Sequence, residues 1–266
     1  MKTKFRFLAL VLVVATLSLQ CTKESDNTPT IPTTIDQFFK AEAFSHEGST
    51  IEYRECSFNT EAQGKASLVV VLHGQYANGS DNEAQLHQDA MMRIWYYFSS
   101  NNDKAVMLAP QCPTGYEWDE NPNTFARLTM PELLKAMIDE YLRKHPSVDA
   151  SRVYICGYSD AYKPAGAGGV WRMLSEYTDT FAAGIIVAAD PDDTISAVNV
   201  AKTPVLSVKG TSDIYAVSPL LDTFADLVRD AGGTIREDVI KVGSREELCR
   251  EAFSAERLDW MMQYAK

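Results

Sequence analysis

The stretch RVYICGYSDAY, residues 152–162, decides how the rest of the chain is interpreted. An apolar run of strand length ends at Gly157, and a tyrosine and Ser159 follow before the sequence becomes polar. Glycine at the end of such a run allows a tight turn and a close approach of neighbouring backbone. The stretch therefore predicts a buried strand followed by a turn that carries Ser159.

Similar apolar runs recur along the chain, at residues 67–74, 105–110, 182–189 and 204–210. Continuous apolar runs of this length fit strands that are buried on both faces, as in a parallel sheet. Amphipathic helical segments lie between them, so we expect a mostly parallel, doubly wound α/β sheet with helices on both faces. The alternating segment 49–58 predicts an antiparallel edge strand.

The clearest helical segment is residues 129–145, whose apolar side chains recur at spacings of three and four. Thr129 and Glu132 form a capping-box pattern at its start, and Pro131 suits the first turn. Residues 218–233 predict a second amphipathic helix, which two glycines close.

The N-terminal segment differs from the rest. A basic start and a short apolar run predict a signal peptide over residues 1–20, and the run is too short to span a bilayer comfortably. Cys21 follows directly and resembles the acylated cysteine of bacterial lipoproteins; the alternative is an ordinary secreted protein. Residues 21–35, rich in Thr and Pro, predict a lipid-anchored flexible linker before a folded domain at 36–266.

The charge of the chain limits its partners. The formal net charge is −11, and loss of the first twenty residues removes three basic side chains and no acidic one. We therefore expect no binding to nucleic acid, and membrane attachment only through acyl chains on Cys21. The expected location is outside the cytoplasm, as an outer-membrane lipoprotein that faces the periplasm or the cell surface.

The remaining cysteines are Cys56, Cys112, Cys156 and Cys249. Four cysteines in an exported protein allow three disulfide pairings, which the sequence leaves open, although Cys156 in an apolar strand suits a buried thiol. Their spacings contain no CxxC, so we predict no metal site, and no pattern in the chain calls for a cofactor.

Several segments around Ser159 resemble one family. APQCPTGYEW (109–118), VDASRVYICGYS (148–159) and GGVW (168–171) resemble, in this order, the predicted-peptidase and poly(3-hydroxybutyrate)-depolymerase-like esterases. These α/β hydrolases include feruloyl and acetyl-xylan esterases, and their serine lies in a G-x-S-x-G turn. The resemblance implies an α/β-hydrolase fold and an esterase that acts on small acyl or carbohydrate esters.

The same resemblance implies roles for individual residues. Ser159 matches the nucleophile, and Asp213 matches the acid of a Ser-His-Asp triad. The backbone N–H groups of Gln75 and Asp160 would form the oxyanion hole.

Three further residues match positions around the family's substrate pocket: His73, Gln111 and Trp118. His73 is also interpreted as a structural residue below the oxyanion loop, and the tryptophan as plain core.

The triad base is missing from this pattern. Ser244 stands where the family has its histidine, and all four histidines of the chain precede Ser159. Without an imidazole, activity at the family's level should fall by several orders of magnitude. A nearby carboxylate, from Asp160, Glu246 or Glu247, is a poor substitute unless burial raises its pKa.

The turn after Ser159 also departs from the family, because residues 161–165 are inserted before GAGGVW. With them removed, the sequence is G-Y-S-D-G. Two functions therefore stay open: an exported serine esterase of doubtful competence, or a catalytically inactive hydrolase-fold lipoprotein that binds a glycan or an ester ligand.

Overall fold

The computed structural model describes residues 34–119, 128–159, 165–211 and 219–266. They belong to one compact unit, residues 31–266. The predictions for Cys21 and the linker lie outside the described residues, as do those for Asp160 and Asp213.

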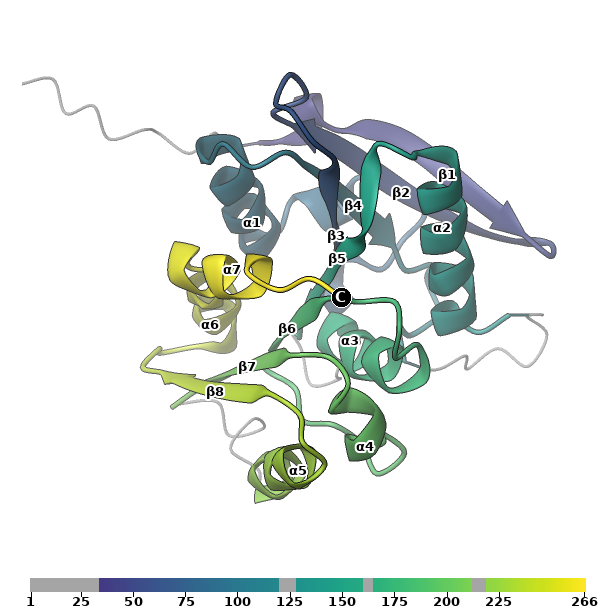
Figure 1. Cartoon of the computed structure of the whole chain (residues 1–266). Helices are drawn as coiled ribbons and strands as arrows, with labels where there is room; N and C mark the ends of the chain where they lie inside the picture. Colours follow the sequence, from purple (N-terminus) through teal and green to yellow (C-terminus); the bar gives the residue numbers. More distant parts are fainter. Residues whose placement is uncertain (1–33, 120–127, 160–164, 212–218) are drawn as a thin grey trace, which may run out of the picture. The chain divides into compact units, whose positions relative to one another are not determined.

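The described residues form an eight-stranded sheet with the order β1-β2-β4-β3-β5-β6-β7-β8 (Figure 1). The strands are β1 (Lys40–His46), β2 (Ser49–Phe58), β3 (Ala66–Leu72), β4 (Ala105–Gln111), β5 (Val148–Tyr158), β6 (Ala183–Val187), β7 (Val205–Gly210) and β8 (Ile235–Ile240). Strand β2 runs in the opposite direction to the seven other strands, which are mutually parallel. The carboxyl ends of β3 to β8 therefore meet at one edge of the sheet.

The expectation that residues 49–58 form an edge strand is wrong, because β1 covers their outer side. Glu47 and Gly48 connect the two strands with positive φ angles of 48° and 83°. Two consecutive residues of this kind match the right-handed twist of a hairpin. The antiparallel direction predicted for the segment is confirmed.

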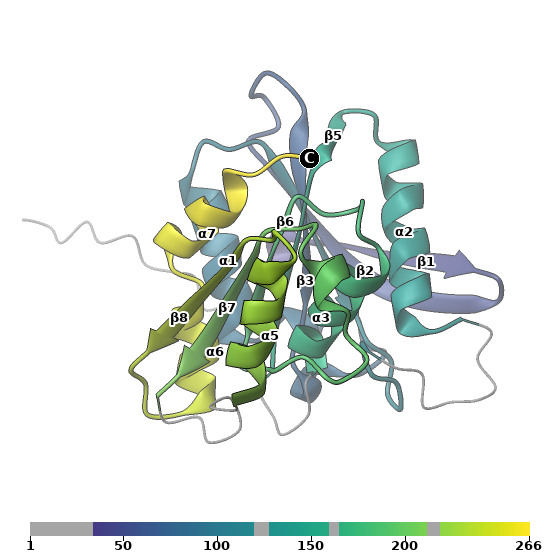
Figure 2. The ribbon, with the colours of Figure 1, turned by 60° about the horizontal axis from the view of Figure 1, so that its bottom comes forward.

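Helices cover both faces of the sheet, as Figure 2 shows. The helices are α1 (Asp89–Ser100), α2 (Met130–Lys144), α3 (Ala165–Glu176), α4 (Ala197–Val200), α5 (Pro219–Asp230), α6 (Arg245–Ala252) and α7 (Ala255–Met262). Successive strand residues point to opposite faces. Val69 and Val71 pack in the core beneath α1, α6 and α7, whereas Leu68 and Val70 pack beneath α2, α3 and α5. Burial on both faces explains the unbroken apolar runs and confirms the doubly wound prediction.

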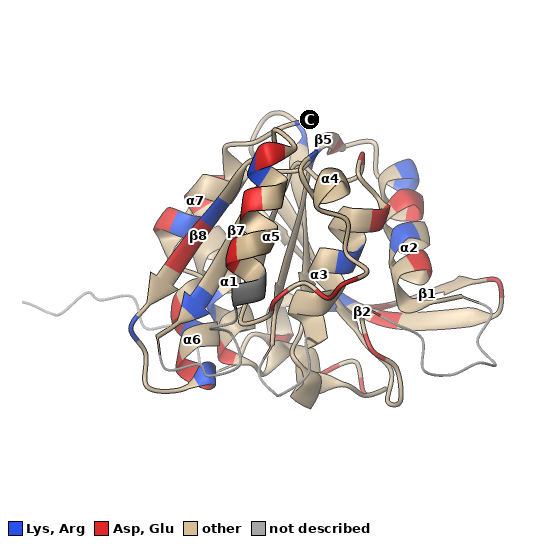
Figure 3. Ribbon diagram, turned by 90° about the horizontal axis from the view of Figure 1, so that it is seen from below, with Lys and Arg blue, Asp and Glu red and all other residues tan. Residues whose placement is uncertain are grey.

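The capping box predicted for α2 is present. The Thr129 side chain accepts a hydrogen bond from the Glu132 N–H, and the Glu132 carboxylate accepts one from the Thr129 N–H at 2.8 Å. Figure 3 shows both signs of charge along this helix, where Lys135 pairs with Asp139. Within the described part of the chain, no helix has both the length and the apolar composition of a membrane span.

Candidate functional site

Ser159 follows the last residue of β5, a central strand, at the edge where the parallel strands end. Its side chain is fully buried, and its N–H donates to the Val187 carbonyl at 3.0 Å. Leu72 pairs with Gly157 in the sheet, so the His73-Gly74 segment lies alongside Ser159. Gln75, the predicted oxyanion donor, begins the 3-10 helix η2 (Gln75–Ala77) directly after this segment. The strand ends thus bring the predicted nucleophile and the predicted oxyanion loop together.

The contacts of two glycines define the junction between β5 and α3. A Cβ on Gly157 would lie 2.2 Å from the Gly166 carbonyl oxygen, and a Cβ on Gly166 would lie 2.2 Å from the Leu72 carbonyl oxygen. Any larger residue at either position collides with backbone. Gly166 therefore takes the role of the last glycine in G-x-S-x-G, and residues 160–165 stand where the pattern has a single residue. This packing supports the interpretation of 161–165 as an insertion.

Positive backbone φ angles near Ser159 occur at two alanines. In the described part of this region, positive φ angles occur at Ala165 (42°) and Ala188 (63°), and not at Ser159. Helix α3 begins at Ala165, directly after the proline at position 164, which a helix interior does not tolerate. Ser159 itself has a negative φ angle.

A guanidinium contacts the serine hydroxyl. Arg245, the first residue of α6, donates from Nη1 to Ser159 Oγ at 3.2 Å. One turn along the same helix, the Cys249 thiol donates to the Ser159 carbonyl at 3.3 Å. Arginine stays protonated at every physiological pH, so Arg245 can stabilise negative charge on Oγ but cannot accept its proton.

The side chain of Ser244, at the position predicted for the missing histidine, forms its hydrogen bond within its own helix. It is the N-cap of α6, and its Oγ accepts from the Glu247 N–H at 3.1 Å. The loop predicted to carry the base therefore does come to Ser159, but the residue that reaches the hydroxyl is Arg245. The distance from Ser244 to the predicted acid lies outside the described residues, because Asp213 does.

His73 is a structural residue. The Cys112 N–H donates to His73 Nε2 at 2.8 Å, so the proton is on Nδ1, which donates to the Gly74 carbonyl at 2.6 Å. Complete burial lowers the pKa of His73 to about 4. Both ring nitrogens hold backbone in place, which leaves the neutral ring no lone pair for the serine proton.

The other histidines lie away from a base position. His87 Nε2 lies 2.7 Å from Asp36 Oδ1, and the residue precedes α1, which begins at Asp89. His145 is the C-cap of α2, at the end of the segment predicted as helical, and stacks on Tyr141. His46 ends β1, at the far edge of the sheet.

Gln111 braces the loop after β3. Its Nε2 donates to Asp81 Oδ1 at 2.7 Å and to the Ala77 carbonyl at 3.1 Å, and its Oε1 accepts from the Asn82 N–H at 2.7 Å. Hydrogen bonds to the Asp81 carboxylate, from the Glu83 backbone first and then from Gln111, lower its pKa to about 2. This amide positions the oxyanion loop from below.

Trp118 supports the same region from the core. Its Nε1 donates to the His73 carbonyl at 3.1 Å, and its Cβ would lie 2.5 Å from a Cβ on Gly169. The side chain is buried. His73, Gln111 and Trp118 thus hold the loops that surround Ser159, and none of them lines the pocket described next.

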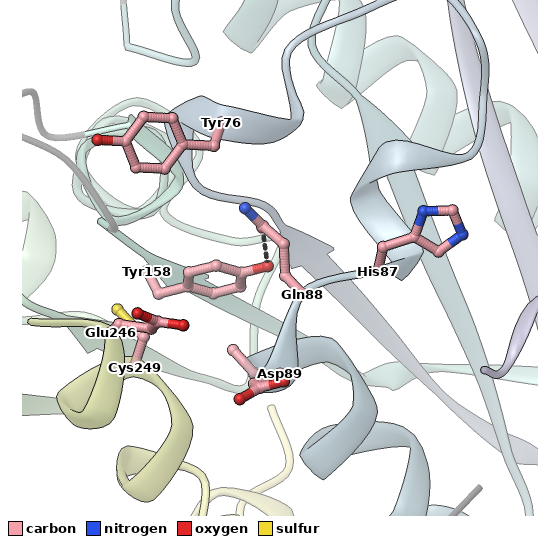
Figure 4. A pocket seen from close by; sticks show the side chains of 8 residues that line it. Tyr76, His87, Gln88, Asp89, Tyr158, Glu246 and Cys249 are labelled. Carbon is pink, nitrogen blue, oxygen red and sulfur yellow. Dashed lines mark hydrogen bonds between the residues drawn. The ribbon is translucent and has the colours of Figure 1, made fainter. Parts of the chain in front are cut away.

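A pocket of about 470 Å³ adjoins Ser159 on the side of α1 and α6 (Figure 4). It is lined by Tyr76, His87, Gln88, Asp89, Ala90, Tyr158, Glu246 and Cys249. Tyr158 precedes the serine, and Cys249 bonds to its carbonyl. Of these residues the sequence singled out only Glu246, as a carboxylate near the site, because the lining comes from three distant segments.

The cysteines Cys56, Cys112, Cys156 and Cys249 are buried thiols, so none of the three disulfide pairings is formed.

Comparison with known proteins identifies the fold. No family model and no curated protein matches the sequence. A thermostable esterase superimposes with a TM-score of 0.73 and 21% identity, over 86% of this chain and 64% of the esterase. The chain thus spans less than two thirds of that protein.

Two smaller proteins match over almost their whole length. A ferulic acid esterase has a TM-score of 0.63 and 13% identity, over 85% of this chain and 98% of its own. An S-formylglutathione hydrolase from Staphylococcus aureus has a TM-score of 0.60 and 12% identity, over 84% and 98%. The chain has an α/β-hydrolase fold, which confirms the prediction.

Proposed function

We propose that this protein binds an acyl or carbohydrate ester at the carboxyl edge of its sheet and does not hydrolyse it efficiently. The observation that carries the proposal is the hydrogen bond from Arg245 to Ser159, at the place where a serine hydrolase needs an imidazole. A positioned general base contributes roughly 10²–10⁴-fold to such reactions. A guanidinium cannot make this contribution, and no histidine follows Ser159 in the chain.

The ligand-binding part of the proposal follows from what the fold retains. The Gly157–Gly166 packing keeps β5 and α3 in the arrangement of a serine hydrolase, and the His73-Gly74-Gln75 loop lies beside Ser159. Structures of esterases share the fold. The site therefore keeps the frame for an acyl group, although no imidazole contacts Ser159 among the described residues.

An active serine esterase is the second candidate. The same glycine packing favours it, since Ser159 stands at the position of the nucleophile after a central strand. In that case Asp213 serves as the acid, as the sequence predicts. The base is then not a histidine that follows Ser159 in the chain, because there is none.

A fluorophosphonate probe separates the two candidates, because it labels only an activated serine. We expect no labelling of Ser159 and no hydrolysis of short p-nitrophenyl esters above that of the Ser159→Ala variant. Calorimetric titration with ethyl ferulate and with acetylated xylo-oligosaccharides measures binding separately. Labelling of Ser159, together with turnover that the Ser159→Ala variant loses, establishes the esterase instead.

A further inference from the structure

Strand β8 ends the sheet, and no described strand pairs with its outer side (Figure 2). On its inner side, the Thr234 carbonyl accepts a hydrogen bond from the Val205 N–H, and the Ile240 carbonyl accepts one from the Thr211 N–H, each at 2.9 Å. Residues whose backbone groups point to one side alternate along a strand. The N–H and C=O groups of the odd-numbered residues of β8 therefore point outward, where an open edge can pair with another chain.

The charged side chains of β8 are bound within the chain. Charges on an open edge often prevent pairing with a second strand. Here the Asp238 carboxylate accepts from Arg236 Nε at 2.8 Å and from Arg257 Nε of α7 at 2.7 Å. Glu237, on the other face of the strand, accepts from Arg229 Nη2 of α5 at 2.7 Å. These ion pairs direct the charges of the strand towards its own helices rather than outward.

Val239 is the apolar side chain that this edge exposes. It is 64% exposed although it lies inside the strand, and it points to the same face as Glu237, two residues before it. Lys241 follows on the same face, is exposed, and makes no ion pair with any described residue. A single exposed valine is ordinary on a protein surface. Its position between an acidic and a basic residue on one open edge is what a symmetric partner can use.

The alternation along β8 also fixes how a second copy of the strand can pair with it in the antiparallel direction. With a two-fold axis through Val239, the two valines lie opposite each other and exchange backbone hydrogen bonds, and Glu237 of each copy lies opposite Lys241 of the other. An axis through Glu237 or Asp238 places two carboxylates opposite each other, which is destabilising. The charges therefore select the axis through Val239.

A cluster of ion pairs joins α5 to β7 and β8, and it favours a further cation. Its members are Lys209, Arg229, Asp222, Asp226 and Glu237. These two basic and three acidic side chains together carry one net negative charge. Lys241 of a second copy, opposite Glu237, supplies the positive charge that balances them.

We propose that the protein forms a dimer in which the β8 strands of two copies pair antiparallel about a two-fold axis through Val239. The two sheets then continue into one. The contact supplies about six backbone hydrogen bonds, two for each pair of opposite outward-facing residues. One short strand covers less area than the roughly 800 Å² per partner of a standard interface, so the dimer should be weak and reversible, with a dissociation constant on the order of 1 µM or above. The proposal goes beyond the function proposed above and does not depend on it.

Sedimentation velocity of the folded chain measures the dimer directly. The mass should rise with concentration from that of one chain, 29.6 kDa, towards twice that value. Val239→Lys should keep the chain monomeric, because it places two positive charges on the axis, and Lys241→Glu should weaken the dimer through repulsion with Glu237 of the second copy. Val198→Lys is the matched control, since Val198 is 66% exposed on α4, and this variant should dimerise like the natural chain.

Cross-linking tests the position of the axis. Opposite Cα atoms of a hydrogen-bonded antiparallel pair are about 5.5 Å apart, which suits a disulfide. In a Cys21→Ser background, where the other four thiols are buried, Val239→Cys should form a covalent dimer in oxidised glutathione, and Val198→Cys should not. Monomers at hundreds of micromolar, a dimer that Val239→Lys leaves intact, or equal cross-linking at the two positions each overturns the proposal.

Discussion

Arg245 Nη1 lies 3.2 Å from Ser159 Oγ and donates a hydrogen bond to it. The two residues are 86 positions apart and are brought together because α6 starts directly above the carboxyl end of β5. The contact places a permanent positive charge beside the hydroxyl that the sequence predicts as the nucleophile.

Replacing the cation and supplying an imidazole should restore chemistry. We expect the Ser244→His/Arg245→Ala variant to hydrolyse p-nitrophenyl acetate faster than Arg245→Ala, by up to the ~10²–10⁴-fold of a positioned base. Ser244→His alone should gain less, since Arg245 still holds the hydroxyl and since the loss of the N-cap costs about 1 kcal/mol. Equal rates for the double variant and Arg245→Ala would show that position 244 is not a base position.

His73 should make the stability of the protein depend on pH. Its folded pKa, about 4, is below its ordinary value of 6.5, so the unfolded chain takes up the proton first as pH falls. The stabilising contribution is complete above about pH 6.5 and decreases towards pH 4, by about 3 kcal/mol in total. Urea unfolding at pH 7 and pH 4.5 measures it.

The matched variant is His73→Gln, which keeps a donor and an acceptor and does not titrate in this range. Its free energy of unfolding should fall less than that of the natural chain over the same interval. Parallel decreases in the two proteins would assign the pH dependence to other groups.

The glycine contact between β5 and α3 should be intolerant of a methyl group. Gly166→Ala places a Cβ 2.2 Å from the Leu72 carbonyl oxygen, and overpacking of this kind costs typically about 1–3 kcal/mol or more. Gly243→Ala is the control, because its nearest neighbour is the end of the Glu247 side chain at 3.4 Å. Thermal unfolding should show a large loss for the first variant and little change for the second.

The lipid anchor remains a proposal that the N-terminal sequence supports. Mass spectrometry of the mature protein should find diacylglycerol on Cys21, and Cys21→Ser should release the protein from the membrane fraction. An unmodified N-terminus at another residue would remove the lipoprotein interpretation, and protease treatment of intact cells tests whether the domain faces outward.

The fold could be predicted because its core strands have a clear sequence pattern. Val69 and Val70 are both buried, on opposite faces, so β3 appears as an unbroken apolar run. Strand β1 was not predicted, since Lys40 and Glu42 interrupt it and most of its residues are not buried. An edge strand with one covered side has no such run to reveal it.

The sequence predicted which segments form the site but not which of their side chains touch one another. The positions of Ser159 and Gly166 follow from local spacing, and the structural role of His73 was one of two interpretations that the sequence allowed. Arg245 was missed because the family resemblance directed the prediction to its neighbour Ser244, and the direction of each side chain depends on where α6 begins. The Asp89–Glu246 pocket joins segments that no short motif connects.

The contact between Gly157 and Gly166 lets the fold be conserved independently of the residues that carry out a reaction. Because the closest approach of strand and helix is between Gly157 and the Gly166 carbonyl, the number of residues between Ser159 and Gly166 can change while this contact is kept. Selection can therefore lengthen, shorten or abandon the catalytic turn while the scaffold persists. A lineage with this junction can lose the catalytic turn and keep the fold, whereas a return to catalysis also needs an imidazole, since no histidine follows Ser159.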